Sequence, residues 1–256
     1  MMPKFKTGII LSGGAMRGVA HLGVLKAIEE AGIKIDVICG TSIGAIIGAF
    51  YANGYKPEEI YQLYRDKNPF KYLRPRIPVN GFLSTNKLFN DFKTYFEGTT
   101  FEDLKISLYV TTTNLTTGRQ ACFNTGSLFP VIKAASAVPI IFNPEKIGDE
   151  LHVDGGLLSN MPVEPLSGQC EYLIGVNVNP IGADHELNSI NSILMRTLHL
   201  SIWGNTNKNI DKLDLYIEPQ NLKKYSLVDQ SHMEGIYEAG YLEGREMLKE
   251  SHLLEI

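Results

Sequence analysis

Apolar residues along the chain follow two patterns. Short, nearly continuous apolar runs predict buried strands, and these runs stand at residues 6–11, 35–39, 107–113, 120–123, 172–179 and 213–217. Longer segments with helix-forming composition predict helices, at residues 19–31, 43–54, 86–96, 127–136, 187–208 and 228–250, with a further helix from Pro57. Strands that alternate with helices predict an α/β fold, a three-layer α/β/α sandwich with a mostly parallel central sheet.

Length and composition narrow the class of protein. A chain of 256 residues can form one domain, so we expect residues 1–256 to be a single domain. A net charge of −4 and a pI near 5.9 give no electrostatic reason to bind nucleic acid. The first residues leave no room for a signal peptide, and no apolar run approaches the roughly 18 residues of a spanning helix. We therefore expect a cytoplasmic protein with, at most, peripheral membrane contact.

Three cysteines, Cys39, Cys122 and Cys170, are odd in number, widely spaced and set in strand-like segments. This pattern predicts buried free thiols in a reducing compartment rather than disulfides or a metal site.

The pentapeptide from Gly40 to Gly44, with Ser42 at its centre, stands between an apolar run and a helix-forming segment. A serine at such a turn from strand to helix is held in a strained conformation with its hydroxyl projecting, and the glycines remove side chains that would collide there. The following helix directs its positive end to the same point, which favours an oxyanion. The pattern predicts a nucleophile elbow, although an ordinary helix cap at Ser42 is equally compatible with the pentapeptide alone.

Two further segments favour the catalytic interpretation. Residues 12–18 form a glycine-rich loop whose N–H groups can converge, as an oxyanion hole requires. Gly14 and Ser42 are separated by one βαβ unit, so both turns are expected at the same edge of neighbouring strands. Downstream, Asp154 ends a short apolar segment and precedes Gly155 and Gly156. These glycines would let its carboxylate approach another backbone, although an Asp-Gly turn is the simpler interpretation.

Together the three segments resemble the motifs of patatin-like phospholipases. Members of that family have a glycine-rich oxyanion loop with a basic residue before its last glycine, then G-x-S-x-G, and later D-G-G or D-G-A. The matching positions are Gly13 to Gly18 with Arg17, Gly40 to Gly44, and Asp154 to Gly156. The resemblance covers residues 6–180 and leaves a C-terminal strand and helices over residues 181–256. One departure is Ala15, which stands where the family usually has a third glycine and is unfavourable if the position needs a positive φ.

The resemblance implies a lipid acyl hydrolase that uses a serine–aspartate dyad, with no catalytic histidine, metal or other cofactor. Ser42 would be the nucleophile and Asp154 its base, made more basic by burial. Backbone N–H groups of Gly13, Gly14 and Ala15 would form the oxyanion hole. The substrate would be a phospholipid or lysophospholipid, or else an acylglycerol. The motif residues expected to support this site are Arg17, Gly18, Gly40, Gly44, Gly155 and Gly156.

Two side chains near these motifs need an interpretation of their own. Arg17 could meet a phosphate headgroup or brace the loop by pairing with a carboxylate, and we favour the bracing role. His152 lies two residues before Asp154 and is expected to be an ordinary strand residue.

Other classes of protein begin in a similar way. A dinucleotide-binding domain also opens with strand, glycine loop and helix, but Ala15 breaks G-x-G-x-x-G, and a P-loop would need a lysine after Gly18. An ordinary α/β-hydrolase places its elbow after more strands and needs a later histidine. A further alternative is a catalytically weak patatin-like regulator or a lipid-binding adaptor. The alanine at position 15, where the family usually has glycine, is compatible with this alternative.

The segment from Arg65 to Arg76 has five basic residues against one acidic, with aromatic residues between them. Such a segment can contact anionic lipid headgroups while its aromatic side chains enter the membrane boundary. It is the best candidate in the sequence for peripheral membrane contact, although an isolated basic loop is more often simply solvated.

Overall fold

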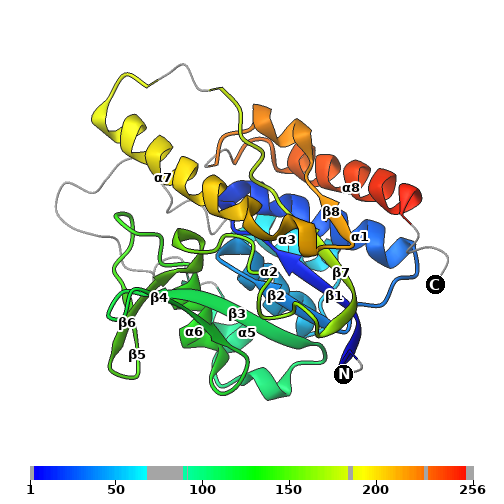
Figure 1. Ribbon diagram of the computed structural model, residues 1–256, viewed down its shortest axis with the longest axis horizontal. Coiled ribbons are helices and arrows are strands. Elements are labelled where there is room, and N and C mark those ends of the chain that lie inside the picture. The colour runs from blue at the N-terminus through cyan, green and yellow to red at the C-terminus, as the bar shows by residue number, and fades with distance from the viewer. Residues whose placement is uncertain (1–2, 68–88, 91, 184–186, 228–229, 252–256) are drawn as a thin grey trace.

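The computed structural model describes residues 3–67, 89–90, 92–183, 187–227 and 230–251 (Figure 1). Across these residues, eight strands form one sheet in the order β5-β6-β3-β2-β1-β7-β8, with β4 paired to β3. The strands are β1 (Phe5–Leu11), β2 (Val37–Gly40), β3 (Ser107–Asn114), β4 (Arg119–Phe123), β5 (Glu145–Ile147), β6 (Glu150–Asp154), β7 (Cys170–Val176) and β8 (Leu215–Ile217).

Helices cover the sheet and connect its strands. The α-helices are α1 (Val19–Glu30), α2 (Ile43–Ala52), α3 (Pro57–Lys67), α5 (Lys93–Phe96), α6 (Leu128–Ala135), α7 (Ile190–Thr206) and α8 (Met233–Glu250). Short 3-10 turns are η1 (Ala15–Gly18), η3 (Phe101–Asp103), η4 (Gly155–Leu157), η5 (Asn207–Lys212) and η6 (Gln220–Lys224). None of these described helices combines the length and apolar character needed to cross a bilayer.

Five strands, β3, β2, β1, β7 and β8, pair in parallel, while β4, β5 and β6 join antiparallel at one end. The predicted α/β fold with a mostly parallel sheet between helices is therefore confirmed. Leu11 at the end of β1 pairs with Gly40 at the end of β2. The turns that follow these two strands thus leave the sheet at the same edge, as the βαβ spacing predicts.

Side chains alternate between the two faces of the sheet, and the faces are covered unequally. Ile9 and Leu11 enter the larger core, which includes residues of α1, α2, α3, α6 and α8. Ile10 enters a smaller core with Met161 and Leu166, so this face is covered partly by irregular chain. Figure 1 shows α1 and α8 side by side and α7 crossing the front of the molecule.

Several element boundaries differ from those predicted. Strand β7 ends at Val176 rather than residue 179, because its parallel partner β1 ends at Leu11 opposite. Strand β5 was not predicted, since its three residues include two charged side chains and no apolar run. The helix predicted over residues 86–96 is described only in part, and there Lys93–Phe96 forms α5. Helices α7 and α8 begin a few residues later than predicted.

The prediction of buried cysteines is correct for one of the three. Cys39 is buried in β2, whereas Cys170 is half-buried and Cys122 is exposed, all as free thiols. Cys122 lies on β4, where every residue is exposed or half-buried, and this explains its exposure.

Candidate active site

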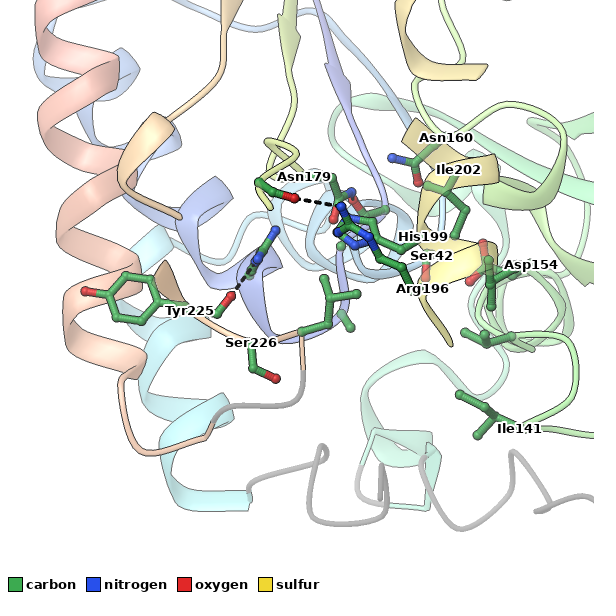
Figure 2. Close-up of a pocket in the computed structure, with 18 of the residues that line it drawn as sticks. Ser42, Ile141, Asp154, Asn160, Asn179, Arg196, His199, Ile202, Tyr225 and Ser226 are labelled. Carbon is green, nitrogen blue, oxygen red and sulfur yellow. Dashed lines mark hydrogen bonds between the residues drawn. The ribbon is translucent and has the colours of Figure 1, made fainter. Parts of the chain in front are cut away.

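Ser42 stands at the turn between β2 and α2, with φ 52° and ψ −126°. A positive φ is sparsely populated by non-glycine residues, and such strain is typical of functional positions. Although Ser42 precedes α2, its side chain makes no capping hydrogen bond to the described residues of that helix. The side chain instead lines a pocket (Figure 2), so helix capping does not explain why a serine stands here.

The elbow is tight because glycines let three backbone segments approach one another. A Cβ at Gly40 would come within 2.6 Å of the Gly44 carbonyl oxygen. A Cβ at Gly44 would collide with the carbonyl group of Leu11 at the end of β1, and one at Gly18 would collide with Ile43. These glycines therefore hold the glycine-rich loop and the elbow together.

The glycine-rich loop connects β1 to η1 and α1. Gly13 donates its backbone N–H to the Asn160 carbonyl at 3.2 Å. Among the described residues, the N–H groups of Gly14 and Ala15 find no acceptor, and both residues line the pocket. Ala15 has a φ of +47°, the strained conformation considered for this position. Of the three expected donors, Gly13 therefore has its N–H engaged in the structure, whereas Gly14 and Ala15 have theirs available beside the pocket.

Asp154 ends β6, and the pairing of β6 with β3 brings it next to the elbow. Along β3, Val110 pairs with Gly40 of β2, and Thr112, two residues further on, pairs with Asp154. Strand β4 pairs with residues 110–114 throughout, and so holds the other edge of β3. Strands β2 and β6 therefore pair with the same edge of β3, and the end of β6 at Asp154 lies just beyond the end of β2 at Gly40. Ser42 follows Gly40 in the turn, so it lies near the end of β6.

Asp154 is buried, with 6% of the residue exposed. Burial raises its pKa to about 6, and the nearby Ser42 side chain and the Gly156 N–H act in the opposite direction. The Gly156 N–H lies 2.8 Å from Oδ1. Asp154 is thus mostly ionised at neutral pH and more basic than a solvated aspartate, whose pKa is about 3.9. Gly155 allows this close packing, because a Cβ there would lie 2.5 Å from the Thr111 carbonyl oxygen.

Ser42, Asp154 and the glycine-rich loop line one pocket of about 670 Å³. This volume is in the range of small-molecule sites, about 300 to 1,000 Å³. Apolar side chains line part of it, among them Val138, Ile141 and Ile202, the last from α7. The pocket can therefore hold an apolar chain beside a hydroxyl and a carboxylate.

Arg17 is buried beside this pocket and braces the loop, but not through a carboxylate. Its Nε donates to the Tyr225 carbonyl at 2.8 Å, and Nη1 donates to the Pro180 carbonyl at 3.4 Å. Burial, and secondarily the charge of Arg196, lower the pKa of Arg17 to about 10. The expected carboxylate partner is thus corrected to two main-chain carbonyls.

A family model described as patatin-like phospholipase matches residues 9–167, more than half of the chain. The chain belongs to the patatin-like phospholipase family. Membership confirms the resemblance seen in the three motifs.

Relatives of this patatin-like domain are much longer proteins. Lysophospholipase NTE1 of Kluyveromyces lactis is 27% identical over 97% of this chain, which spans 19% of that relative. The Saccharomyces cerevisiae lysophospholipase NTE1 is also 27% identical, over 94% of this chain and 16% of its own length. An uncharacterized NTE family protein of Mycobacterium bovis, Mb1092c, is 29% identical over 68% of this chain and 49% of its own length.

Solved structures show the same fold at low identity. VipD from Legionella pneumophila aligns with a TM-score of 0.58 and 17% identity, covering 97% of this chain and 67% of VipD. A chain of the ExoU–SpcU complex of Pseudomonas aeruginosa aligns with a TM-score of 0.56 and 16% identity, covering 99% of this chain and 52% of that one. Both likenesses support the α/β architecture.

Asn205, near the end of α7, has a role that the sequence does not predict. Its Oδ1 accepts the Asn160 N–H at 2.8 Å, and its Nδ2 donates to the carbonyls of Gly156 and Leu157 at 3.0 and 3.3 Å. One side chain thus ties α7 to the segment that follows Asp154. A single asparagine inside a helical pattern carries no sequence signal for this role.

Histidines occupy two positions near the site. His152 is buried in β6, with Nδ1 2.8 Å from the Thr112 Oγ1, which agrees with its expected place in a strand. His199 of α7 lines the pocket and was not singled out from the sequence. Among the described residues, no three His, Cys, Asp or Glu side chains gather as they would around a metal ion.

Proposed function

We propose that this domain is a serine acyl-ester hydrolase that acts on phospholipids or lysophospholipids through a Ser42–Asp154 dyad. The observation that carries this proposal is that Ser42 lines the same pocket as the buried Asp154 carboxylate, whose pKa is raised by burial to about 6 and lowered in part by the Ser42 side chain. A base of that pKa is mostly ionised at pH 7 and still accepts a proton readily. The names of the two yeast relatives, both lysophospholipases, support a lysophospholipid as substrate.

In the first half of the reaction, Asp154 takes the hydroxyl proton of Ser42 as Oγ attacks the acyl carbon. The carbonyl oxygen becomes an oxyanion, and the N–H groups of Gly14 and Ala15 are the candidate donors to it. Each such donor is typically worth about 2.7 to 4 kcal/mol in the transition state. The C–O bond to the alcohol then breaks, the alcohol takes the proton from Asp154, and an acyl-enzyme remains on Ser42.

In the second half, Asp154 accepts a proton from water, and the resulting hydroxide attacks the acyl carbon of the acyl-enzyme. The same N–H groups hold the second oxyanion. The bond to Ser42 Oγ breaks, Oγ recovers the proton from Asp154, and the fatty acid leaves. Apolar side chains such as Ile141 and Ile202 would surround the acyl chain, since they line the pocket beside Ser42.

A fluorophosphonate probe tests whether Ser42 is an activated nucleophile. We expect labelling of the wild-type protein, no labelling of Ser42→Ala, and unchanged labelling of Ser167→Ala, because Ser167 is exposed and does not line the pocket. Failure of the folded wild type to label would reject the proposal. Loss of labelling in a folded histidine variant such as His152→Gln would indicate a histidine-dependent mechanism.

A catalytically weak regulator or lipid-binding adaptor is the second candidate. Two observations favour it: the Gly13 N–H is engaged by Asn160, and Ala15 holds a strained conformation in the donor loop. An adaptor would bind lysophospholipid micelles without releasing fatty acid. Release of fatty acid by the wild type but not by Ser42→Ala would exclude it.

We further propose that the chain folds as one domain in the cytoplasm. The C-terminal strand β8 pairs with β7, so elements after residue 180 share the sheet of the motif region. Peripheral membrane contact through the segment from Arg65 to Arg76 remains a proposal from the sequence, because residues 68–76 lie outside the described residues. Replacing Lys67, Lys71, Arg74 and Arg76 by glutamine should weaken sedimentation with anionic vesicles, and unchanged sedimentation would reject this segment.

A further inference from the structure

Basic side chains gather around part of the pocket that contains Ser42. Of the described residues that line it, four are lysine or arginine and one, Asp154, is acidic. The basic residues are Arg17, Arg196, Lys223 and Lys224. The whole chain carries a net charge of −4, so this concentration of positive charge runs against the balance of the molecule. Figure 2 shows Arg196 beside the same pocket as Ser42 and Asp154.

Neutral groups hold the two arginines in place. Arg17 donates to the Tyr225 and Pro180 carbonyls, and Arg196 donates from Nη2 to the Gly182 carbonyl at 2.6 Å. Among the described residues, neither guanidinium forms an ion pair with a carboxylate. Because Arg196 contributes to lowering the pKa of Arg17, the two positive charges repel each other across a partly buried space.

Two positive charges that line one pocket, with no carboxylate paired to them among the described residues, are stabilised when an anion binds between them. We infer that Arg196, with Lys223 and Lys224, binds the phosphate group of a lipid headgroup while the acyl ester of the same lipid lies at Ser42. This inference rests on the proposed hydrolase function and selects phosphate-bearing lipids over neutral acylglycerols as its substrates.

The residues have different parts in this subsite. Arg196 is half-buried and uses one of its five N–H donors in the hydrogen bond to Gly182, which leaves a fork for two phosphate oxygens. Lys223 and Lys224 are exposed in η6, where they add positive potential at the rim. Arg17 is directed at main-chain carbonyls, so it adds charge and holds the Tyr225 segment in position.

The decisive measurement is a ratio of kcat/KM values for two substrates with the same palmitoyl chain, lysophosphatidylcholine and monopalmitoylglycerol. In Arg196→Gln this ratio should fall about tenfold or more, which is the loss in kcat/KM expected when one hydrogen bond to a charged group is removed. Arg196→Lys should recover part of the ratio, since it keeps the charge but loses the fork. Arg119→Gln, the same change on an exposed strand residue away from the pocket, should leave the ratio at its wild-type value.

The rim lysines provide a test that does not depend on the folding of the Arg196 variants. Lys223→Gln combined with Lys224→Gln should lower the ratio in the same direction by about threefold, because exposed charges contribute less. Unchanged ratios in this double variant and in a folded Arg196→Gln would overturn the inference.

Free phosphate is the other source of the same chemistry, and a second measurement distinguishes it. Inorganic phosphate binding is measured by calorimetry with Ser42→Ala, alone and combined with Arg196→Gln. If Arg196→Gln abolishes phosphate binding but leaves the substrate ratio unchanged, the site takes free phosphate and the headgroup assignment is wrong. If no acyl ester is hydrolysed at all, the hydrolase proposal fails by itself, and phosphate binding still reports on the anion site.

Discussion

Replacing Asp154 by asparagine separates two effects of the buried carboxylate: its unfavourable contribution to the free energy of folding and its proposed role as the catalytic base. Asparagine has nearly the same shape and keeps an oxygen for the Gly156 N–H, which now bonds Oδ1 at 2.8 Å. It cannot take a proton from Ser42, and it carries no charge. The variant should therefore keep the fold, lose activity and become more stable at neutral and basic pH.

The stability gain follows from the pKa of Asp154, which rises from 3.8 in the unfolded chain to about 6 in the folded protein. The raised pKa means that the folded state binds the proton more tightly, so this group favours folding below pH 3.8 and loses that contribution as pH rises through 6. With 1.36 kcal/mol for each pKa unit, the buried carboxylate costs up to about 3 kcal/mol at pH 8. The cost is about half as large at pH 5.

Urea unfolding of wild type and Asp154→Asn at pH 8 and pH 5 checks this reasoning. The midpoint of the variant should be higher at both values, with the larger difference at pH 8, while kcat/KM falls by at least about 100-fold, the smaller end of general-base effects. Asp149→Asn is the matched control, because Asp149 is fully exposed and the change there should move stability by less than about 0.5 kcal/mol. A variant at position 154 that is less stable at pH 8, or equally stabilised at both values, would refute the argument from burial.

Three further outcomes are expected. Wild-type kcat/KM on a p-nitrophenyl ester should be half-maximal near pH 6 on the acid side, because Asp154 must be ionised; an acid limb near pH 4 would contradict the raised pKa. Ala15→Gly should raise the melting temperature, because glycine adopts a positive φ without the strain of about 1 to 2 kcal/mol that alanine carries there. Ala27→Gly in α1 should lower it, because glycine is less favourable than alanine inside a helix. Asn205→Ala should lower kcat about tenfold with little change in KM, because the main-chain groups near Asp154 that bond this side chain lose their partner, at a cost of about 1 to 3 kcal/mol. The control Asn124→Ala, at an exposed position, should leave kcat unchanged.

The parts of the site that the sequence predicts are those set by local pattern. An apolar run, a glycine-rich turn and a helix follow one another twice within the first 52 residues, and parallel pairing then brings the two turns together. Asp154 as the partner of Ser42 is implied by the resemblance to a family and not by local pattern. Nothing in the local pattern around Asp154 predicts that β6 continues along the edge of β3 beyond Gly40.

Contacts to main-chain atoms left no signal in the sequence. The Arg17 side chain was expected to pair with a carboxylate, but the carbonyls of Pro180 and Tyr225 accept its hydrogen bonds. The engagement of the Gly13 N–H by Asn160 is of the same kind. Every residue has such a carbonyl, so only the three-dimensional path of the chain decides which one is used.

Backbone strain in the described part of the chain is concentrated at this one pocket. Among the described residues, the non-glycine residues with positive φ are Ala15, Ser42 and Ile140, and the first two line the pocket while the third lies between two residues that do. Such conformations cost on the order of 1 to 3 kcal/mol each and persist only where surrounding structure enforces them. Much of that enforcement comes from beyond residue 167, where the family match ends, through the Tyr225 carbonyl and the Asn205 side chain. The C-terminal segment is therefore part of what holds the site in its strained form, and a chain cut after β7 should lose the site even if the motif region still folds.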